Sequence, residues 1–222
     1  MNNITLTGKI LSKPKLKSVG ETELAEGFLE FDVPYSNGRV ETIAAVVWGK
    51  NALAFSELRD NTVICIEGRV EMEKRNIEGV NITIPKLVIS EFQLNSAKIV
   101  INKVYLVGRL GQDPELKFLE TGKSIASSTL AVSRRSKNKD TDWFNLKVWD
   151  KTAEIFKNYA QKGSQVGIVG RLDFEKWKDK TSGDDRSRCV VVFTELDLLG
   201  SKADNATNVA SNYQPKNDLI PF

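Results

Sequence analysis

The chain has 222 residues, 41% of them hydrophobic, so it can hold one large or two small domains with packed cores. Histidine is absent, which excludes Ser-His-Asp and Cys-His catalysis and histidine-ligated metals, and the net charge of +3 is too small for a general polycation. No apolar run approaches the ~20 residues of a membrane span and the N-terminus lacks signal-peptide features, so we expect a cytoplasmic, nucleoid-associated protein without a membrane partner.

Two halves of the chain repeat one another, with an offset that drifts from 100 to 102 residues. Four blocks match in the same order: Met1–Ile10 with Ile101–Leu110, Pro14–Lys17 with Pro114–Lys117, Val47–Lys50 with Val148–Lys151, and Ile66–Val70 with Ile168–Leu172. This pattern is typical of a duplicated domain. We therefore predict one domain over 1–97, a second over 98–200, and a tail over 201–222.

Each copy is predicted to contain five strands, with a short helix between the third and the fourth. The first copy's strands are Ile4–Leu11, Gly27–Pro34, Arg39–Trp48, Val63–Glu71 and Val80–Phe92, and its helical face carries Ala52, Phe55 and Leu58. The second copy's strands are Val104–Leu110, Ile125–Ser133, Trp143–Trp149, Gln165–Phe174 and Arg188–Leu199, and its helical face carries Ala153, Phe156, Tyr159 and Ala160. This order predicts an all-β fold class of two tandem five-stranded OB-fold barrels. A flat antiparallel sheet with a helix is the alternative.

The tail changes character along its length. Ser201–Lys216 is polar and without periodicity, which is typical of a disordered segment. The chain then ends in the mostly apolar run Asp218, Leu219, Ile220, Pro221 and Phe222. Such a run is either a frayed end or a peptide that docks on another protein.

The most informative stretch is the third strand of the second copy. Alternation along a strand places two sets of side chains on opposite faces. One set is a core face, with Phe144, Leu146 and Val148. The other set contains Trp143, Asn145, Lys147 and Trp149. Two tryptophans, an amide and a cation suit unpaired bases on a phosphate backbone, although a core role for both rings is the plainer reading.

Basic residues surround this stretch and interleave with aromatic ones. Residues 99–200 hold 18 basic and 14 acidic residues, whereas residues 1–98 hold 12 and 13. The hairpin before Trp143 carries Arg134, Arg135, Lys137 and Lys139. Lys176 and Lys178 flank Trp177, which we place in an exposed polar loop. The prediction is that Trp143, Trp149 and Trp177 stack bases, at roughly 1–3 kcal/mol each, while the cations neutralise phosphates, with little sequence preference.

Other functions fit the sequence less well. Asp140 and Asp142, with Asp184 and Asp185, could form a nuclease metal cluster, but they lie among basic residues and read as solvated charges. We therefore expect no enzyme activity, no metal and no cofactor. An RNA-binding OB protein and a replication-accessory module that binds other proteins remain as alternatives.

At these residues the second copy resembles the bacterial single-stranded DNA-binding protein family. The resemblance covers about residues 100–200, and its motifs are Asn102–Leu116, Lys162–Val166, Gly170–Leu172 and Lys176–Trp177. It implies that Trp143, Trp149 and Trp177 stack on bases, with Phe118 as a further candidate. The run from Asp218 to Phe222 is similar to the family's C-terminal tip, which docks replication, recombination and repair enzymes.

The resemblance also implies four OB folds per working unit, and hence a homodimer of this two-barrel chain. Several positions depart from the family pattern. Arg135 and Ser136 stand where the family often has another stacking tryptophan, and the tip has a single acid, Asp218. The first copy keeps one stacking tryptophan, Trp48, and has Arg75 in the place of Trp177. We therefore expect residues 1–97 to have a degenerate groove and to serve assembly, through an apolar strip at Ala44 and Val46.

Overall fold

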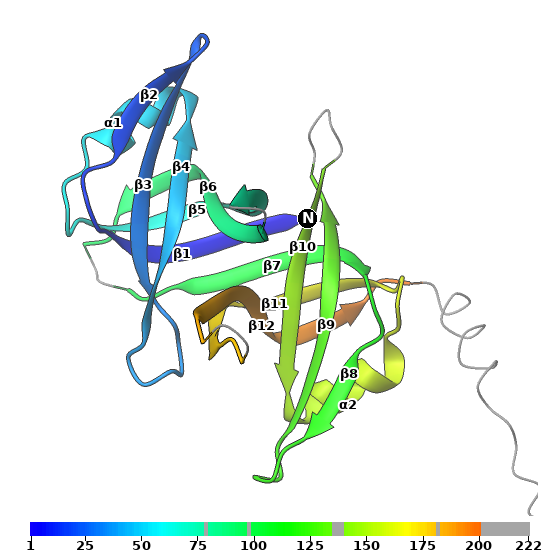
Figure 1. The fold of residues 1–222 in the computed structure, drawn as a ribbon. Helices are drawn as coiled ribbons and strands as arrows, with labels where there is room; N and C mark the ends of the chain where they lie inside the picture. The colour runs from blue at the N-terminus through cyan, green and yellow to red at the C-terminus, as the bar shows by residue number, and fades with distance from the viewer. Residues whose placement is uncertain (78–79, 97–98, 135–139, 181–182, 201–222) are drawn as a thin grey trace, which may run out of the picture.

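The computed structural model describes residues 1–77, 80–96, 99–134, 140–180 and 183–200, and its two halves are built alike (Figure 1). The first half contains β1 (Asn2–Ile10), β2 (Lys15–Val19), β3 (Thr22–Asp32), β4 (Val40–Trp48), the 3-10 turn η1 (Gly49–Asn51), α1 (Ala52–Ser56), β5 (Val63–Ile77) and β6 (Val80–Leu94). The second half contains β7 (Asn102–Leu110), β8 (Glu115–Phe118), β9 (Ser124–Ser133), β10 (Thr141–Trp149), α2 (Asp150–Tyr159), β11 (Gln165–Lys178) and β12 (Asp185–Leu198). No helix among these residues is long and apolar enough to span a membrane.

The strands of each half close into a ring. β1 pairs with both β3 and β5, β3 with β4, and β5 with β6, all antiparallel, while β4 and β6 close the ring with a parallel pair. β7, β9, β10, β11 and β12 repeat the same pattern. A closed five-stranded ring with a helix after its third long strand is an OB fold. The predicted fold class, two tandem OB-fold barrels, is therefore confirmed.

Each helix packs its apolar side chains against a barrel. In the second barrel, α2 buries Ala153 and Phe156, and the Phe156 ring meets Phe193 of β12 edge to face at 5.2 Å between centroids. In the first barrel, Phe55 of the short helix α1 meets Phe92 of β6 in the same way at 5.5 Å. The helical period predicted Ala52, Phe55, Ala153 and Phe156 on these contact faces correctly, but Tyr159, which we also placed there, is 63% exposed.

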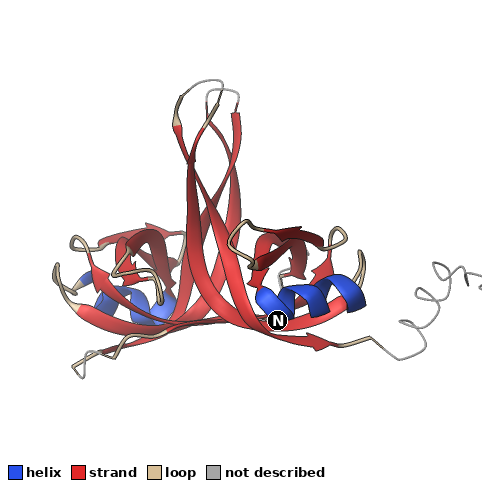
Figure 2. Cartoon of the chain, turned by 90° about the horizontal axis from the view of Figure 1, so that it is seen from below, coloured by secondary structure: helices blue, strands red, loops and turns tan. Residues whose placement is uncertain are grey.

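The long strands β5 and β11, which follow the helix in each barrel, each bend at a β-bulge that contains glycine. Register shifts fall at Glu67/Gly68 in β5 and at Val169/Gly170 in β11. A Cβ on Gly170 would lie 2.5 Å from the Val192 carbonyl oxygen, so only glycine allows this close approach of the two strands. Beyond the bulges the hairpins β5–β6 and β11–β12 continue past the barrels and stand together at the middle of the molecule (Figure 2).

The two barrels are joined through their first strands. β1 and β7 pair antiparallel, with Ile4 opposite Val104, so one twelve-stranded sheet runs through both barrels. Each first strand begins with an asparagine that bonds another strand of its own barrel, and Asn102 also donates across the junction to the Asp32 carbonyl oxygen at 3.3 Å. The Asn102 amide donates to the Leu172 carbonyl oxygen at 2.9 Å and accepts from its N–H at 2.8 Å, and Asn2 contacts Val70 in the same two ways. The barrels therefore form one continuous body.

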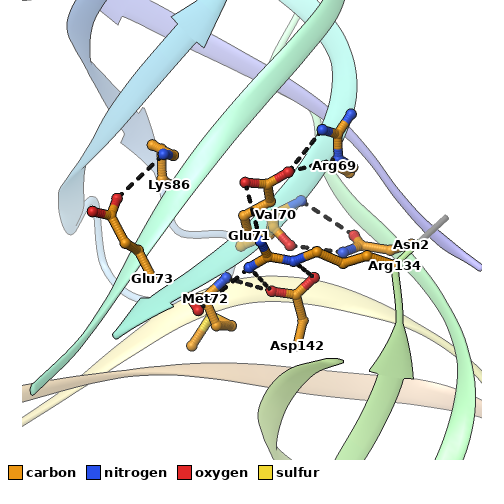
Figure 3. Close-up of polar contacts among 9 residues, drawn as sticks. All are labelled: Asn2, Arg69, Val70, Glu71, Met72, Glu73, Lys86, Arg134 and Asp142. Carbon is orange, nitrogen blue, oxygen red and sulfur yellow. Dashed lines mark hydrogen bonds and ion pairs between the residues drawn. The ribbon is translucent and has the colours of Figure 1, made fainter. Parts of the chain in front are cut away.

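A buried ion pair reinforces this junction (Figure 3). Asp142 of β10 is 1% exposed, accepts the Met72 N–H of the first barrel at 2.7 Å, and accepts the Arg134 Nη2 donor at 2.6 Å and its Nε donor at 2.9 Å. Arg134 also lies 3.6 Å from the Glu71 carboxylate across the junction. The interpretation of Asp142 as a solvated loop charge is therefore wrong, because its carboxylate holds the two barrels together.

Three other expectations need correction. The short edge strands β2 and β8 were not predicted, because their sequences are mostly polar or charged and lack a buried face. β11 extends to Lys178, so Trp177 lies in a strand and not in a loop. Val46 is only 5% exposed and packs with Leu24 and Val88 of its own barrel, so it does not offer the free apolar strip that we expected.

Candidate nucleic-acid interface

The outer face of β10 carries the side chains that alternation placed there. Phe144, Leu146 and Val148 are each 1% exposed and belong to the core, as predicted. Trp143 and Trp149 point outward and remain 45% and 38% exposed. A tryptophan that keeps more than a third of its residue surface in water can offer its indole ring for stacking.

A cleft of about 770 Å³ lies beside this face, between β10 and the β11–β12 hairpin. The aromatic residues that line it are Trp149, Phe174 and Trp177, and the buried valines Val190 and Val192 of β12 also line it. Trp177 is 45% exposed, so its predicted exposure is confirmed although its loop position is not. The charged side chains that line the cleft are five cations, Arg39, Lys147, Arg171, Lys176 and Arg188, and two carboxylates, Asp173 and Glu175.

The two carboxylates hold some of these cations in place. Glu175 forms ion pairs with both Lys147 and Arg188, the latter at 2.6 Å. The Arg188 guanidinium also lies 5.7 Å from the centroid of the Trp177 ring, a distance at which a cation is attracted to an indole face. The cleft therefore presents an orienting network around one tryptophan, with an excess of positive charge for phosphates.

Lys147 is the more buried of the two cations that pair with Glu175, with its side chain 23% exposed against 53% for Arg188. Desolvation lowers the pKa of its ammonium group below the ordinary value, and the nearby Arg188 lowers it further, while Asp173 opposes the shift. Lys147 therefore loses its charge at a lower pH than a solvated lysine does. A phosphate contact made by Lys147 weakens accordingly as the pH rises into the alkaline range.

The structure does not gather all the predicted aromatic residues in this cleft. Trp143 lies six residues before Trp149, about 20 Å along the strand, and packs over the backbone of Gly111. A Cβ on Gly111 would come within 2.4 Å of the Trp143 ring, so glycine allows the ring to approach the backbone this closely. Phe118 is 71% exposed, but its register partner Ser124 belongs to the inward-facing set of β9. The tryptophans thus mark a path along β10 and β11, and Phe118 lies off it.

The equivalent face of the first barrel differs in chemistry. Trp48 is 46% exposed and occupies the position of Trp149, but Val46 stands where the second barrel has Lys147. Glu26 and Glu30 of β3 stand where β9 has Ser127 and Ala131. On the last strand, register places Ile82 and Ile84 where β12 has Arg186 and Arg188. This face therefore lacks the excess of cations that the second barrel offers to phosphates.

Phe28, an exposed aromatic residue of the first barrel, was not among the predicted site residues. Phe28 is 53% exposed and faces outward from β3 opposite Ala44. Its neighbours Leu29 and Phe31 are buried, so Phe28 is out of phase with the core positions of this strand. That phase was the signal available in the sequence.

Comparison with known proteins assigns the family. A model described as the single-strand binding protein family matches residues 101–199. The single-stranded DNA-binding protein 1 of Synechocystis sp. is 51% identical over 115 residues, which is 51% of this chain and 95% of the relative. The chain belongs to the single-strand binding protein family. A second family member, from Nostoc sp., is 49% identical over 117 residues, or 53% of this chain and 98% of that protein.

Solved structures of this family share the architecture of nearly the whole chain. The wild-type single-stranded DNA-binding protein from Thermus aquaticus superimposes with a TM-score of 0.71 at 20% identity, covering 90% of this chain and 94% of that one. A deletion variant of the same protein superimposes with a TM-score of 0.72 at 19% identity. It covers 91% of this chain and 96% of the variant. At such identities the likeness concerns the fold, and it includes both barrels.

The remaining predicted contacts of this family member are placed as follows. Arg134 forms an ion pair with Asp142 at the junction and does not line the cleft. Lys176 bonds Glu41 of the first barrel at 2.8 Å, and Lys178 is exposed at the end of β11. Arg75 is exposed and pairs with Glu73 at 2.8 Å. Arg135, Lys137 and Lys139, and the tip from Asp218 to Phe222, lie outside the described residues.

Proposed function

We propose that the chain binds and coats single-stranded DNA with little sequence preference, without catalysing a reaction. The observation that carries this proposal is the cleft in which two half-exposed tryptophans, Trp149 and Trp177, stand among five cations. Bases stack on aromatic faces whatever their identity, and cations that meet phosphates release counterions. The names of the similar proteins, which state single-stranded DNA binding for them, support the same function.

The proposal assigns different roles to different parts of the chain. Residues 98–200 would be the main DNA-binding domain, with the strand running along Trp143, Trp149 and Trp177. Residues 1–97 would serve mainly assembly, because Glu26 and Glu30 of β3 stand where β9 has Ser127 and Ala131 and make this face less suited to phosphates. A homodimer would place four barrels around the DNA, and sedimentation equilibrium should then give the mass of two chains. We place the protein in the cytoplasm, with the nucleoid.

The test of this function is the intrinsic fluorescence of the tryptophans during titration with oligothymidine. Because stacked bases quench indole emission, we expect strong quenching that saturates at a defined number of nucleotides per chain. A duplex of the same length should quench weakly, and raising the salt concentration should lower the affinity for the single strand. Equal quenching by duplex and single strand, or none by either, would overturn the proposal.

The C-terminal tip is proposed to recruit replication, recombination and repair enzymes. The run from Asp218 to Phe222 is apolar apart from its single acid, which suits docking in a hydrophobic groove. Deleting residues 218–222 should abolish binding of a purified partner enzyme in surface plasmon resonance and leave oligothymidine affinity unchanged. A variant with the same five residues in scrambled order is the matched control, and it should behave like the deletion. Unchanged enzyme binding by the deletion would remove the docking role.

A further inference from the structure

The hairpin between β3 and β4 of the first barrel reaches the cleft of the second barrel. Arg39, at the end of this hairpin, donates from Nη1 to the Phe174 carbonyl oxygen at 2.9 Å and forms an ion pair with Asp173. Arg39 is also one of the residues that line the cleft. In Figure 1 the loop joining β3 to β4 extends past β7 toward the second barrel. One wall of the cleft therefore comes from the barrel whose own outer face is poor in cations.

Tyr35 stands at the turn of this hairpin and is 96% exposed. Its backbone has φ of 61°, the left-handed region that non-glycine residues adopt rarely. The Arg171 guanidinium of the second barrel lies over the ring, 5.8 Å from its centroid, and the rest of the ring surface meets solvent. An exposed aromatic ring that stands beside a cation can serve as a stacking platform for a base.

Arg171 lacks the ion pairs that the other cations of the cleft form within the described residues. Within the described part of the chain it forms no ion pair, and its buried Nε has no hydrogen-bond partner. It nevertheless lines the cleft next to Trp149 and Trp177. The other cations of the cleft are partly neutralised by Asp173, Glu175 and Glu41. Arg171 is therefore the cation that is most available to a phosphate.

We infer that Tyr35 and Arg171 together form a further nucleotide-binding position, built by both barrels, at which a base stacks on Tyr35 and its phosphate pairs with Arg171. A single strand that leaves the cleft of Trp149 and Trp177 then continues onto the first barrel by way of this hairpin. The inference rests on the proposed DNA-binding function. It adds to that function one subsite and the path that the strand takes from the cleft to the first barrel. It also gives the first barrel a share in binding that does not depend on its own outer face.

The experiment replaces Tyr35 in the full-length chain and measures the affinity for oligothymidines of increasing length by fluorescence anisotropy. Tyr35→Asn removes the ring and keeps a residue that tolerates the left-handed backbone. We expect its affinity for long oligomers to fall by about fivefold or more, the lower end of one base stack, and its affinity for the shortest oligomers to be unchanged. Tyr35→Phe, which retains the ring, should bind as the parent does.

Tyr159→Asn is the matched control, because Tyr159 is also exposed, at 63%, but lies on α2 and does not line the cleft. Parent-like affinity of Tyr35→Asn at every length, while Trp177→Ala binds weakly, overturns the subsite and leaves the proposed function intact. Parent-like affinity of Trp177→Ala as well overturns both. Equal losses in Tyr35→Asn and Tyr159→Asn also count against the subsite, because the loss would then not depend on the position of the ring.

Discussion

Replacing Asp142 by alanine is expected to lower the free energy of unfolding by about 3–5 kcal/mol, the usual cost of removing one partner from a buried ion pair. The carboxylate is 1% exposed and accepts three hydrogen bonds, two from Arg134 and one from the Met72 N–H. Without it, a guanidinium that is only 21% exposed and a backbone donor lose their partner at the barrel junction. For a chain of this size the melting temperature should fall by roughly 6–20 °C.

The control for this prediction is Asp140→Ala. Asp140 lies two residues before Asp142, and its side chain is exposed. Surface substitutions of this kind usually change stability by less than about 0.5 kcal/mol. Urea unfolding followed by circular dichroism measures both variants. If the melting and urea midpoints of Asp142→Ala matched those of the parent, Arg134 and Met72 would have found other partners, and the carboxylate would not secure the junction.

Most of the architecture could be predicted because the sequence contains an internal repeat, so each element is indicated by two segments. The repeat at offsets of 100 to 102 placed ten strands and two helices without any knowledge of their contacts. The phase of alternation in β10 separated Phe144 and Leu146 from Trp143 and Trp149 correctly. Such patterns are local, so they can be recognised from periodicity alone.

What the sequence could not provide are the contacts between the barrels. Asp142 and Met72 lie 70 residues apart, so an acid that looks like a loop charge becomes the most buried carboxylate of the junction. Tyr35 and Arg171 meet only because β1 pairs with β7 and brings the β3–β4 hairpin to the second barrel. Trp177 was placed in a loop because its charged neighbours mask the alternation of a long hairpin that leaves the barrel.

The two tryptophans that line the cleft, Trp149 and Trp177, should each contribute strongly to binding of single-stranded DNA. Trp177→Ala and Trp149→Ala are each expected to lower the affinity for oligothymidine by roughly 5- to 150-fold, the range of one lost base stack at about 1–3 kcal/mol. Both rings line the cleft with its cations, so a base and its phosphate can be held there together. Neither side chain belongs to the buried core, so both variants should melt near the parent.

Salt dependence separates stacking from charge at this site. Trp177→Ala should keep the parent's slope of log affinity against log salt concentration, because no phosphate contact is lost. Arg188→Gln should reduce that slope by about 0.7, the value for one phosphate contact on a single strand. Trp48→Ala is the matched control, since Trp48 is 46% exposed at the position equivalent to Trp149 but lacks a lysine beside it. If Trp48→Ala lost as much affinity as Trp149→Ala, stacking alone would determine binding, and the first barrel would hold DNA as firmly as the second.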